Sequence, residues 1–318
     1  MNRRDFLRGT AAAAGASVLA GGTAGTRTVR ASEPAGDARP GAEPFRCDFA
    51  PHLGMFRNSA GDDPIGQLQF MADQGFRSLE DNGMKGRAVA EQERIAAEMG
   101  RLGMRMGVFV AHTIHWTEPN LASGDAGKRE EFLAEIRESV DVARRVNATW
   151  MTVVPGHIDP RLHLDYQTAN VVESLRQASA ILEPHGLVMV LEPLNPRDHP
   201  GLFLKGIPQA YQICRAVDSP ACKILDDLYH QQITEGNLIP NLDAAWNEIA
   251  YFQIGDNPGR REPTTGEINY GNVFQHIWDR GFRGILGMEH GNATPGPEGE
   301  RAVIEAYRSV DAHGQPPE

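Results

Sequence analysis

Short apolar segments recur along the chain from about residue 45 onward, and longer segments with helical periodicity separate them. Most of the short segments are apolar at consecutive positions, which is typical of strands buried on both faces of a parallel sheet. We predict eight such strands, at Cys47–Ala50, Ser78–Asp81, Arg105–Ala111, Trp150–Val154, Val188–Glu192, Lys223–Asp227, Ala250–Ile254 and Ile285–Glu289.

The segments between these strands have the spacing of amphipathic helices. In one of them Phe132, Ile136 and Val140 fall on one face, and Asn147 follows as an expected helix end. The predicted helices are Pro64–Gln74, Val89–Arg101, Lys128–Val146, Thr168–Glu183, Pro208–Val217, Leu242–Glu248, Tyr270–Arg280 and Gly299–Val310.

Strands that alternate with helices predict an α/β fold with a parallel sheet. Eight strand–helix units within residues 45–312 match a TIM (β/α)8 barrel, which typically has about 250 residues in a single domain. A doubly wound open sheet is the alternative. The glycine-rich G-x-G-x-x-G pattern that would favour a dinucleotide-binding sheet is absent after the first strand.

The first 44 residues differ from the rest of the chain. Arg3 and Arg4 precede a short Ala/Gly-rich apolar stretch, so residues 1–31 resemble a twin-arginine signal peptide and residues 32–44 a linker. The apolar stretch is shorter than the roughly 20 residues of a membrane span. We expect export through the twin-arginine translocase to the periplasm or beyond, without stable membrane insertion. An Ala-rich helix with chance arginines is the alternative.

Composition and charge narrow the functional classes. Hydrophobic residues make up 41% and charged residues 23%, which is globular composition, and the formal net charge of −11 argues against a nucleic-acid-binding protein. Three cysteines cannot form a dense disulfide framework. The sequence leaves open whether Cys214 and Cys222 pair or remain core thiols.

Oxygen-bearing side chains stand at the ends of four consecutive predicted strands. They are Glu192, Asp227, Gln253 and Glu289. The active site of a TIM barrel lies at the carboxyl ends of its strands, so these side chains are expected to converge. Buried carboxylates need compensating charge, and an all-oxygen ligand set favours Mg²⁺ or Mn²⁺ over Zn²⁺. For any single acid the alternative is a salt bridge at the barrel rim.

At these residues the sequence resembles the hydroxypyruvate isomerases, which belong to the xylose isomerase-like group of sugar isomerases and epimerases. The most similar segments are Leu191–Gly201, Asp227–Ile233, Gln253–Arg260 and Glu262–Tyr270. The resemblance implies a TIM barrel with a metal held by Glu192, Asp227, Gln253 and Glu289. It also implies that His230 contacts substrate oxygens, with an ordinary loop histidine as the alternative.

The implied reaction converts hydroxypyruvate to tartronate semialdehyde through an enediolate. We expect Glu192 and Glu289 to move the proton, since a positioned carboxylate contributes on the order of 10²–10⁴ to such a step. Arg260 is expected to bind a substrate carboxylate, because a guanidinium binds carboxylates bidentately; a rim salt bridge to Asp256 or Glu262 is the alternative. His52, after the first strand, is expected to line the pocket.

Other functions remain open at this stage. An exported sugar or keto-sugar epimerase, dehydratase or lyase would use the same strand-end residues, because each begins by removing a proton next to a carbonyl. A non-catalytic sugar-binding barrel is a further alternative. An abasic-site endonuclease is disfavoured, because such a nuclease needs a histidine-rich zinc cluster and a basic face for DNA, whereas this chain is acidic.

Overall fold

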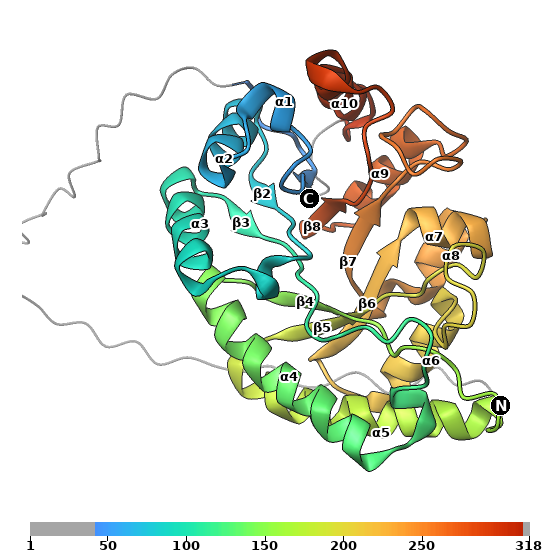
Figure 1. The fold of residues 1–318 in the computed structure, drawn as a ribbon. Coiled ribbons are helices and arrows are strands. Elements are labelled where there is room, and N and C mark those ends of the chain that lie inside the picture. Colours follow the sequence, from blue (N-terminus) through green and yellow to red (C-terminus); the bar gives the residue numbers. More distant parts are fainter. Residues whose placement is uncertain (1–41, 314–318) are drawn as a thin grey trace, which may run out of the picture. The chain divides into compact units, whose positions relative to one another are not determined.

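Eight parallel strands form the centre of the molecule in a computed structural model that describes residues 42–313 (Figure 1). The six strands in the order β1-β8-β7-β6-β5-β4 make one sheet, and β2 pairs with β3. Their bounds are β1 Asp48–Ala50, β2 Ser78–Leu79, β3 Arg105–Met106, β4 Trp150–Val153, β5 Val188–Leu191, β6 Cys222–Asp227, β7 Ile249–Ile254 and β8 Ile285–Met288.

Single backbone bridges join the two sheets into a closed barrel. His52 pairs with Glu80 between β1 and β2, and Val110 pairs with Thr152 between β3 and β4. The first and last strands are hydrogen-bonded neighbours, since Asp48–Ala50 pairs in parallel with Ile285–Gly287. The predicted TIM barrel is therefore confirmed, and the open doubly wound sheet is excluded because its terminal strands would not pair.

Helices surround the barrel (Figure 1). Their bounds are α1 Arg57–Ala60, α2 Pro64–Asp73, α3 Val89–Leu102, α4 Ala126–Val146, α5 Leu164–Leu182, α6 Ile207–Val217, α7 Leu228–Thr234, α8 Leu238–Ala245, α9 Tyr270–Asp279 and α10 Gly296–Val310. Short 3₁₀ helices lie at Met84–Gly86, Leu121–Ser123, Glu183–His185 and Trp246–Glu248.

Helix α4 shows why the sequence folds this way locally. Asp125 caps its first turn by accepting a hydrogen bond from the Lys128 amide at 2.9 Å. The chain leaves the helix at Asn147, whose left-handed backbone (φ 54°) is tolerated by asparagine. Phe132 and Ile136 on its inner face are buried, so the amphipathic prediction is confirmed.

The strands divide the core into two layers. Alternate side chains of a strand point to opposite faces. Leu191 belongs to the large cluster shared with the helices, whereas its neighbour Val190 packs with Leu225, Tyr251 and Ile285 in a separate small cluster. We assign that small cluster to the barrel interior. It fills the space beneath the carboxyl ends of the strands and makes a firm floor for a site there.

Several boundaries differ from the expectation. Strands β2 and β3 have only two paired residues each, because beyond Leu79 and Met106 the chain keeps contact with its neighbours only through isolated bridges. Helices α1 and α7 were not predicted, since neither is long enough to show periodicity in the sequence.

The predicted signal peptide, residues 1–31, and all but the last three residues of the predicted linker, residues 32–44, lie outside the described residues. Within residues 42–313, no helix combines the length and the apolar character that a bilayer span requires. The thiols of Cys214 and Cys222 are free and buried, so no disulfide joins them in this structure. The adjacent Cys214 thiol and burial raise the pKa of Cys222.

Candidate active site

The four oxygen-bearing side chains all stand at the carboxyl ends of their strands, as predicted. Glu192 follows β5, Asp227 ends β6, Gln253 is the penultimate residue of β7, and Glu289 follows β8. Asp227 and Gln253 are direct register partners on adjacent strands. Glu192, Asp227 and Gln253 are buried, and the side chain of Glu289 keeps 27% of its surface exposed.

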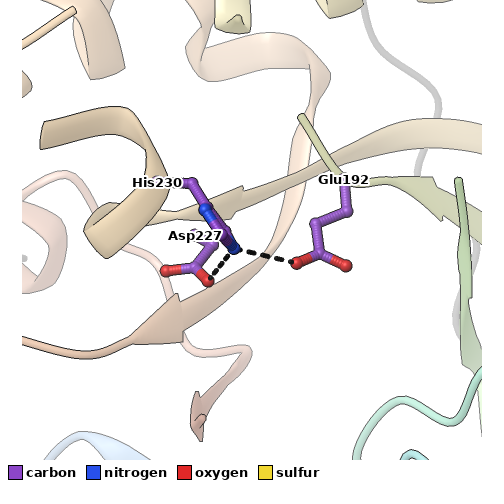
Figure 2. Close-up of side chains that lie close together, drawn as sticks. All are labelled: Glu192, Asp227 and His230. Carbon is purple, nitrogen blue, oxygen red and sulfur yellow. Dashed lines mark ion pairs between the residues drawn. The ribbon is translucent and has the colours of Figure 1, made fainter. Parts of the chain in front are cut away.

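His230 lies between two of these carboxylates (Figure 2). Its Nε2 is 3.5 Å from Asp227 Oδ2 and 3.9 Å from Glu192 Oε1. One ligand atom from each of these three residues lies within 4.8 Å of the other two, so the trio is close enough to hold a metal ion. Burial lowers the pKa of His230 to about 4, and the imidazole is therefore neutral at pH 7.

Hydrogen bonds assign a tautomer to this neutral imidazole. The backbone amide of Asn195 donates to His230 Nδ1 at 3.3 Å, and the side-chain Nδ2 of Asn195 lies 2.6 Å from the same atom. Because Nδ1 accepts these bonds, the proton is on Nε2, which has no hydrogen-bond acceptor among the described residues. This favours His230 as a donor toward a substrate oxygen over a role as a metal ligand.

Arg260 occupies the mouth of the barrel and bridges two of the strand ends. Its Nη2 donates to Asp227 Oδ2 at 2.9 Å and to Glu289 Oε2 at 2.8 Å, and the guanidinium lies over the ring of Tyr229. Burial by itself would lower the pKa of Arg260. The negative charges of Glu289, Asp227 and Glu192 have the larger effect, so the pKa of Arg260 is raised.

The alternative role for Arg260, a rim pair with Asp256 or Glu262, is wrong. Asp256 instead accepts backbone amides of its own loop, including those of Gly266 and Ile268. Glu262 accepts the amide of Ala293.

Acidic side chains outnumber basic side chains in this site. Burial, followed by the charges of Glu289 and Asp227, raises the pKa of Glu192 well above its usual value. Burial raises the pKa of Glu289 to about 7, although Arg260 opposes this. A single guanidinium is thus shared among several carboxyls that disfavour one another's ionisation.

The donor set fits a divalent cation. Gln253 Oε1 is buried and has no hydrogen-bond donor among the described residues, which is costly unless another partner satisfies it. Carboxylate oxygens of Glu192, Asp227 and Glu289 complete a set of oxygen ligands of the kind that Mg²⁺ and Mn²⁺ prefer. Among the described residues, the group whose ligand atoms lie close enough together for one ion is Glu192, Asp227 and His230, and Glu289 is paired with Arg260 instead. The structure thus brings together Glu192 and Asp227 of the predicted ligands.

Two residues after β2 also belong to the site and were not predicted from the sequence. Asn82 Nδ2 donates to Glu289 Oε1 at 3.0 Å. Glu80 accepts hydrogen bonds from Gln253 Nε2 and from Tyr251 Oη, both at 2.8 Å, and burial raises its pKa well above the usual value. The polar run from Glu80 to Asn82 follows a buried strand as the other four strand-end residues do, and that signal could have identified it.

A cavity of about 490 Å³ opens beside Glu289 and Arg260. His52 lines it, as expected from its place after β1, together with Asn82 and His290. The His52 ring is held by the carbonyl of Leu53 and by that of His290, at 3.0 and 3.1 Å. A small ligand in this cavity would lie against the carboxyl of Glu289.

Comparisons with known proteins find relatives that are named as isomerases. The chain is 32% identical to hydroxypyruvate isomerase of Escherichia coli (strain K12) over 208 residues, which is 62% of this chain and 79% of the relative. It is 29% identical to 2-oxo-tetronate isomerase of Cupriavidus necator over 244 residues, 76% of this chain and 92% of the relative.

Solved structures share the fold. An AP endonuclease of family 2 from Brucella melitensis superimposes with a TM-score of 0.73 and 24% identity, over 83% of this chain and 99% of the other. A 3-keto-D-glucoside 4-epimerase from E. coli gives a TM-score of 0.70 at 18% identity, over 83% and 99%. At such identities the likeness extends to the fold alone.

A model of the xylose isomerase-like TIM barrel family matches residues 68–310. With the closed barrel and its acidic strand ends, this match shows that the chain belongs to the xylose isomerase-like TIM barrel family.

Proposed function

We propose that the protein is a metal-assisted isomerase of a small hydroxy-keto acid, with hydroxypyruvate and its conversion to tartronate semialdehyde as the reference reaction. The enzyme class is supported by the relatives named hydroxypyruvate isomerase and 2-oxo-tetronate isomerase. A reaction of this class removes a proton from the carbon next to a carbonyl and returns it to the adjacent carbon.

The observation that carries the proposal is the pair of carboxyls of Glu192 and Glu289 at the ends of β5 and β8. The side chain of Glu192 is buried, that of Glu289 is 27% exposed, and burial raises the pKa of Glu289 to about 7. A group whose pKa is near the working pH takes up and returns a proton with little penalty, which is what a catalytic base requires. Asn82 holds the carboxyl of Glu289 in place through Oε1.

Glu192, Asp227, Gln253 and Glu289 would hold the divalent ion, with Mg²⁺ or Mn²⁺ the proposed choice. When bound, such an ion acts as a Lewis acid that stabilises the negative charge developing on the substrate oxygens. The proton on His230 Nε2 faces the same site and is available to a substrate oxygen.

Arg260 provides the charge for an acidic substrate. Its side chain is 30% exposed and lines the cavity, while its Nη2 holds Asp227 and Glu289. A substrate carboxylate in the cavity would pair with this guanidinium. His52 forms part of the wall of the same cavity.

We also propose that the protein acts outside the cytoplasm, after export through the twin-arginine translocase. The support for this is the sequence of residues 1–31, with its paired arginines and short apolar stretch. A reporter fused behind residues 1–44 tests it. Export that depends on Arg3 and Arg4 is expected, and retention of the reporter in the cytoplasm would contradict the proposal.

The test of the reaction is turnover of Glu192→Gln and Glu289→Gln against the native protein, with Mn²⁺ present. Each substitution removes a proton-accepting group, so kcat is expected to fall by about 10²- to 10⁴-fold while the circular dichroism spectrum is unchanged. Glu267→Gln changes an exposed carboxyl on the loop before α9 and is the matched control, which is expected to retain activity.

The substrate panel should include three- and four-carbon 2-oxo acids, ketoses and 3-keto-glycosides. The cavity volume of about 490 Å³ is larger than a three-carbon acid occupies, so the panel extends to larger compounds. Solvent deuterium incorporated at the carbon next to the carbonyl reports the proton transfer directly. An undiminished kcat for Glu289→Gln would rule out its role.

A further inference from the structure

The geometry points to Glu80 as a positioning residue that turns the acceptor end of the Gln253 amide toward the metal site. The inference rests on the metal site of the proposed function and adds to it a residue outside the ligand set. Glu80 follows β2, and Gln253 lies on β7; strands β1 and β8 stand between these two strands in the barrel. Glu80 is almost completely buried, at 1% exposure.

Each oxygen of the Glu80 carboxyl has its own donor. Oε1 accepts the hydrogen bond from Gln253 Nε2, and Oε2 accepts the one from Tyr251 Oη, both at 2.8 Å. The backbone amide of Val108 donates to Tyr251 Oη at 3.4 Å. The carboxyl is therefore held at both oxygens by side chains of β7.

Two glycines, one on β8 and one directly after β3, make room for this arrangement. A Cβ at Gly287 on β8 would lie 1.7 Å from Glu80 Oε2, and a Cβ at Gly107 would lie 2.4 Å from Tyr251 Oη. Neither position has a positive φ, so steric room, and not backbone conformation, accounts for glycine here. The barrel backbone is thus shaped to admit Glu80 and Tyr251.

The consequence concerns the amide of Gln253. A carboxylate ligand presents an oxygen whichever way it turns, but an amide has a donor end and an acceptor end. Gln253 Nε2 donates to Glu80, so the other end of the amide, the acceptor Oε1, is directed away from Glu80. Oε1 is buried and has no hydrogen-bond donor among the described residues. Groups behind a ligand commonly orient it and tune metal affinity in this way.

The variant Glu80→Gln reverses this preference. Tyr251 needs an acceptor at the Oε2 position, so the new amide oxygen is expected there and the new NH₂ faces Gln253. The Gln253 amide must then turn over and present its NH₂ to the metal site. We expect Mn²⁺ affinity to fall by about 10- to 100-fold.

The double variant Glu80→Gln/Gln253→Glu is the rescue. The amide at position 80 donates to one oxygen of the new carboxylate, and the other oxygen faces the site. Mn²⁺ affinity should return to within a few-fold of the native value. Glu300→Gln is the matched control, because Glu300 is equally buried and accepts three hydrogen bonds from residues 58 and 59, outside the metal site.

Mn²⁺ dissociation constants from calorimetry supply the first readout. The second uses metal-free protein labelled with [¹⁵N]glutamine, with the Gln253 side-chain resonance identified by its absence from Gln253→Glu. In the native protein this NH₂ is expected to be protected from solvent exchange, and that measurement stands even where Glu80→Gln fails to fold. A rapidly exchanging native Gln253 NH₂ would overturn the inference.

The inference and the proposed reaction fail in distinguishable ways. If the affinity drop and its rescue are observed while no substrate of the panel is turned over, Glu80 keeps its role and the reaction is wrong. If the native enzyme is active but Glu80→Gln binds Mn²⁺ unchanged, or the double variant stays weak, the inference is wrong. A native protein that binds no divalent ion overturns it as well.

Discussion

The substitution Gly287→Ala tests how tightly the barrel interior is packed around Glu80. The added methyl group would lie 1.7 Å from Glu80 Oε2, and ordinary contact begins at 3.4 Å, so about 1.7 Å of separation must be created. Glu80 is almost fully buried, and although it lines the cavity, both of its carboxyl oxygens are held by hydrogen bonds. A shift of that size exceeds the slack of a 2.8 Å hydrogen bond, so at least one bond, to Tyr251 or Gln253, is broken.

The expected cost combines two terms. Overpacking a core costs about 1–3 kcal/mol, and a buried hydrogen-bonding group left without its partner costs about 1–3 kcal/mol. The free energy of unfolding should therefore fall by about 2–6 kcal/mol, which lowers Tm on the order of 10 °C.

Urea unfolding of the metal-free protein, followed by circular dichroism, measures this cost. Gly100→Ala is the matched control, because Gly100 lies within α3 and a Cβ there meets nothing within 4 Å. That control should gain about 0.5–1 kcal/mol, since alanine is the better helix former. A Gly287→Ala protein within 0.5 kcal/mol of native stability would refute the close approach of Glu80 to β8.

Three further outcomes are expected. Metal-free Arg260→Gln should lose about 1–3 kcal/mol of stability, because Asp227 and Glu289 lose their shared partner. Added Mn²⁺ should raise the Tm of this variant by more than it raises the Tm of the native protein. An equal rise in thermal melts would count against the metal site. Burial lowers the pKa of His290 to about 3, so this histidine carries no penalty above pH 6.5, where it is neutral in both the folded and the unfolded state. Below pH 6.5 only the unfolded chain takes up the proton. The free energy of unfolding therefore falls by up to about 1.4 kcal/mol per pH unit as the pH drops toward 4. In His290→Met, urea titrations across that range should show a shallower slope. Asn147→Val should lose about 1–2 kcal/mol, because a β-branched residue disfavours φ 54°, whereas Asn147→Gly should not; equal denaturation midpoints would contradict this.

The positions of the principal site residues were predictable because they depend on local pattern. An apolar run followed by an acid predicts a strand end, and the ends of parallel strands share one edge of the barrel. Glu192, Asp227 and Glu289 were identified in this way. Glu80 and Asn82 follow the same rule, but β2 has only two paired residues, so its apolar signal is too short to stand out.

The contacts among these residues were not predictable. Arg260 was expected to bind a substrate carboxylate or to pair with a nearby rim acid such as Asp256. Its partners within the chain are Asp227, 33 residues before it, and Glu289. The tautomer of His230, a residue of α7, depends on Asn195 in the segment after β5. Both contacts depend on which segments the closed barrel brings together.

The sequence by itself determined the eight strand–helix units, the edge at which the polar side chains meet, and the excess of acidic oxygens there. It could do so because periodicity and residue type at a strand end are local properties. Only the tertiary structure decided the partner and orientation of each polar group. The bond between Glu80 and Gln253 joins residues 173 positions apart, and it depends on barrel closure and on the space that Gly287 leaves. Hydrogen-bond geometry is set by distances of a few tenths of an ångström, which no pattern along the chain encodes.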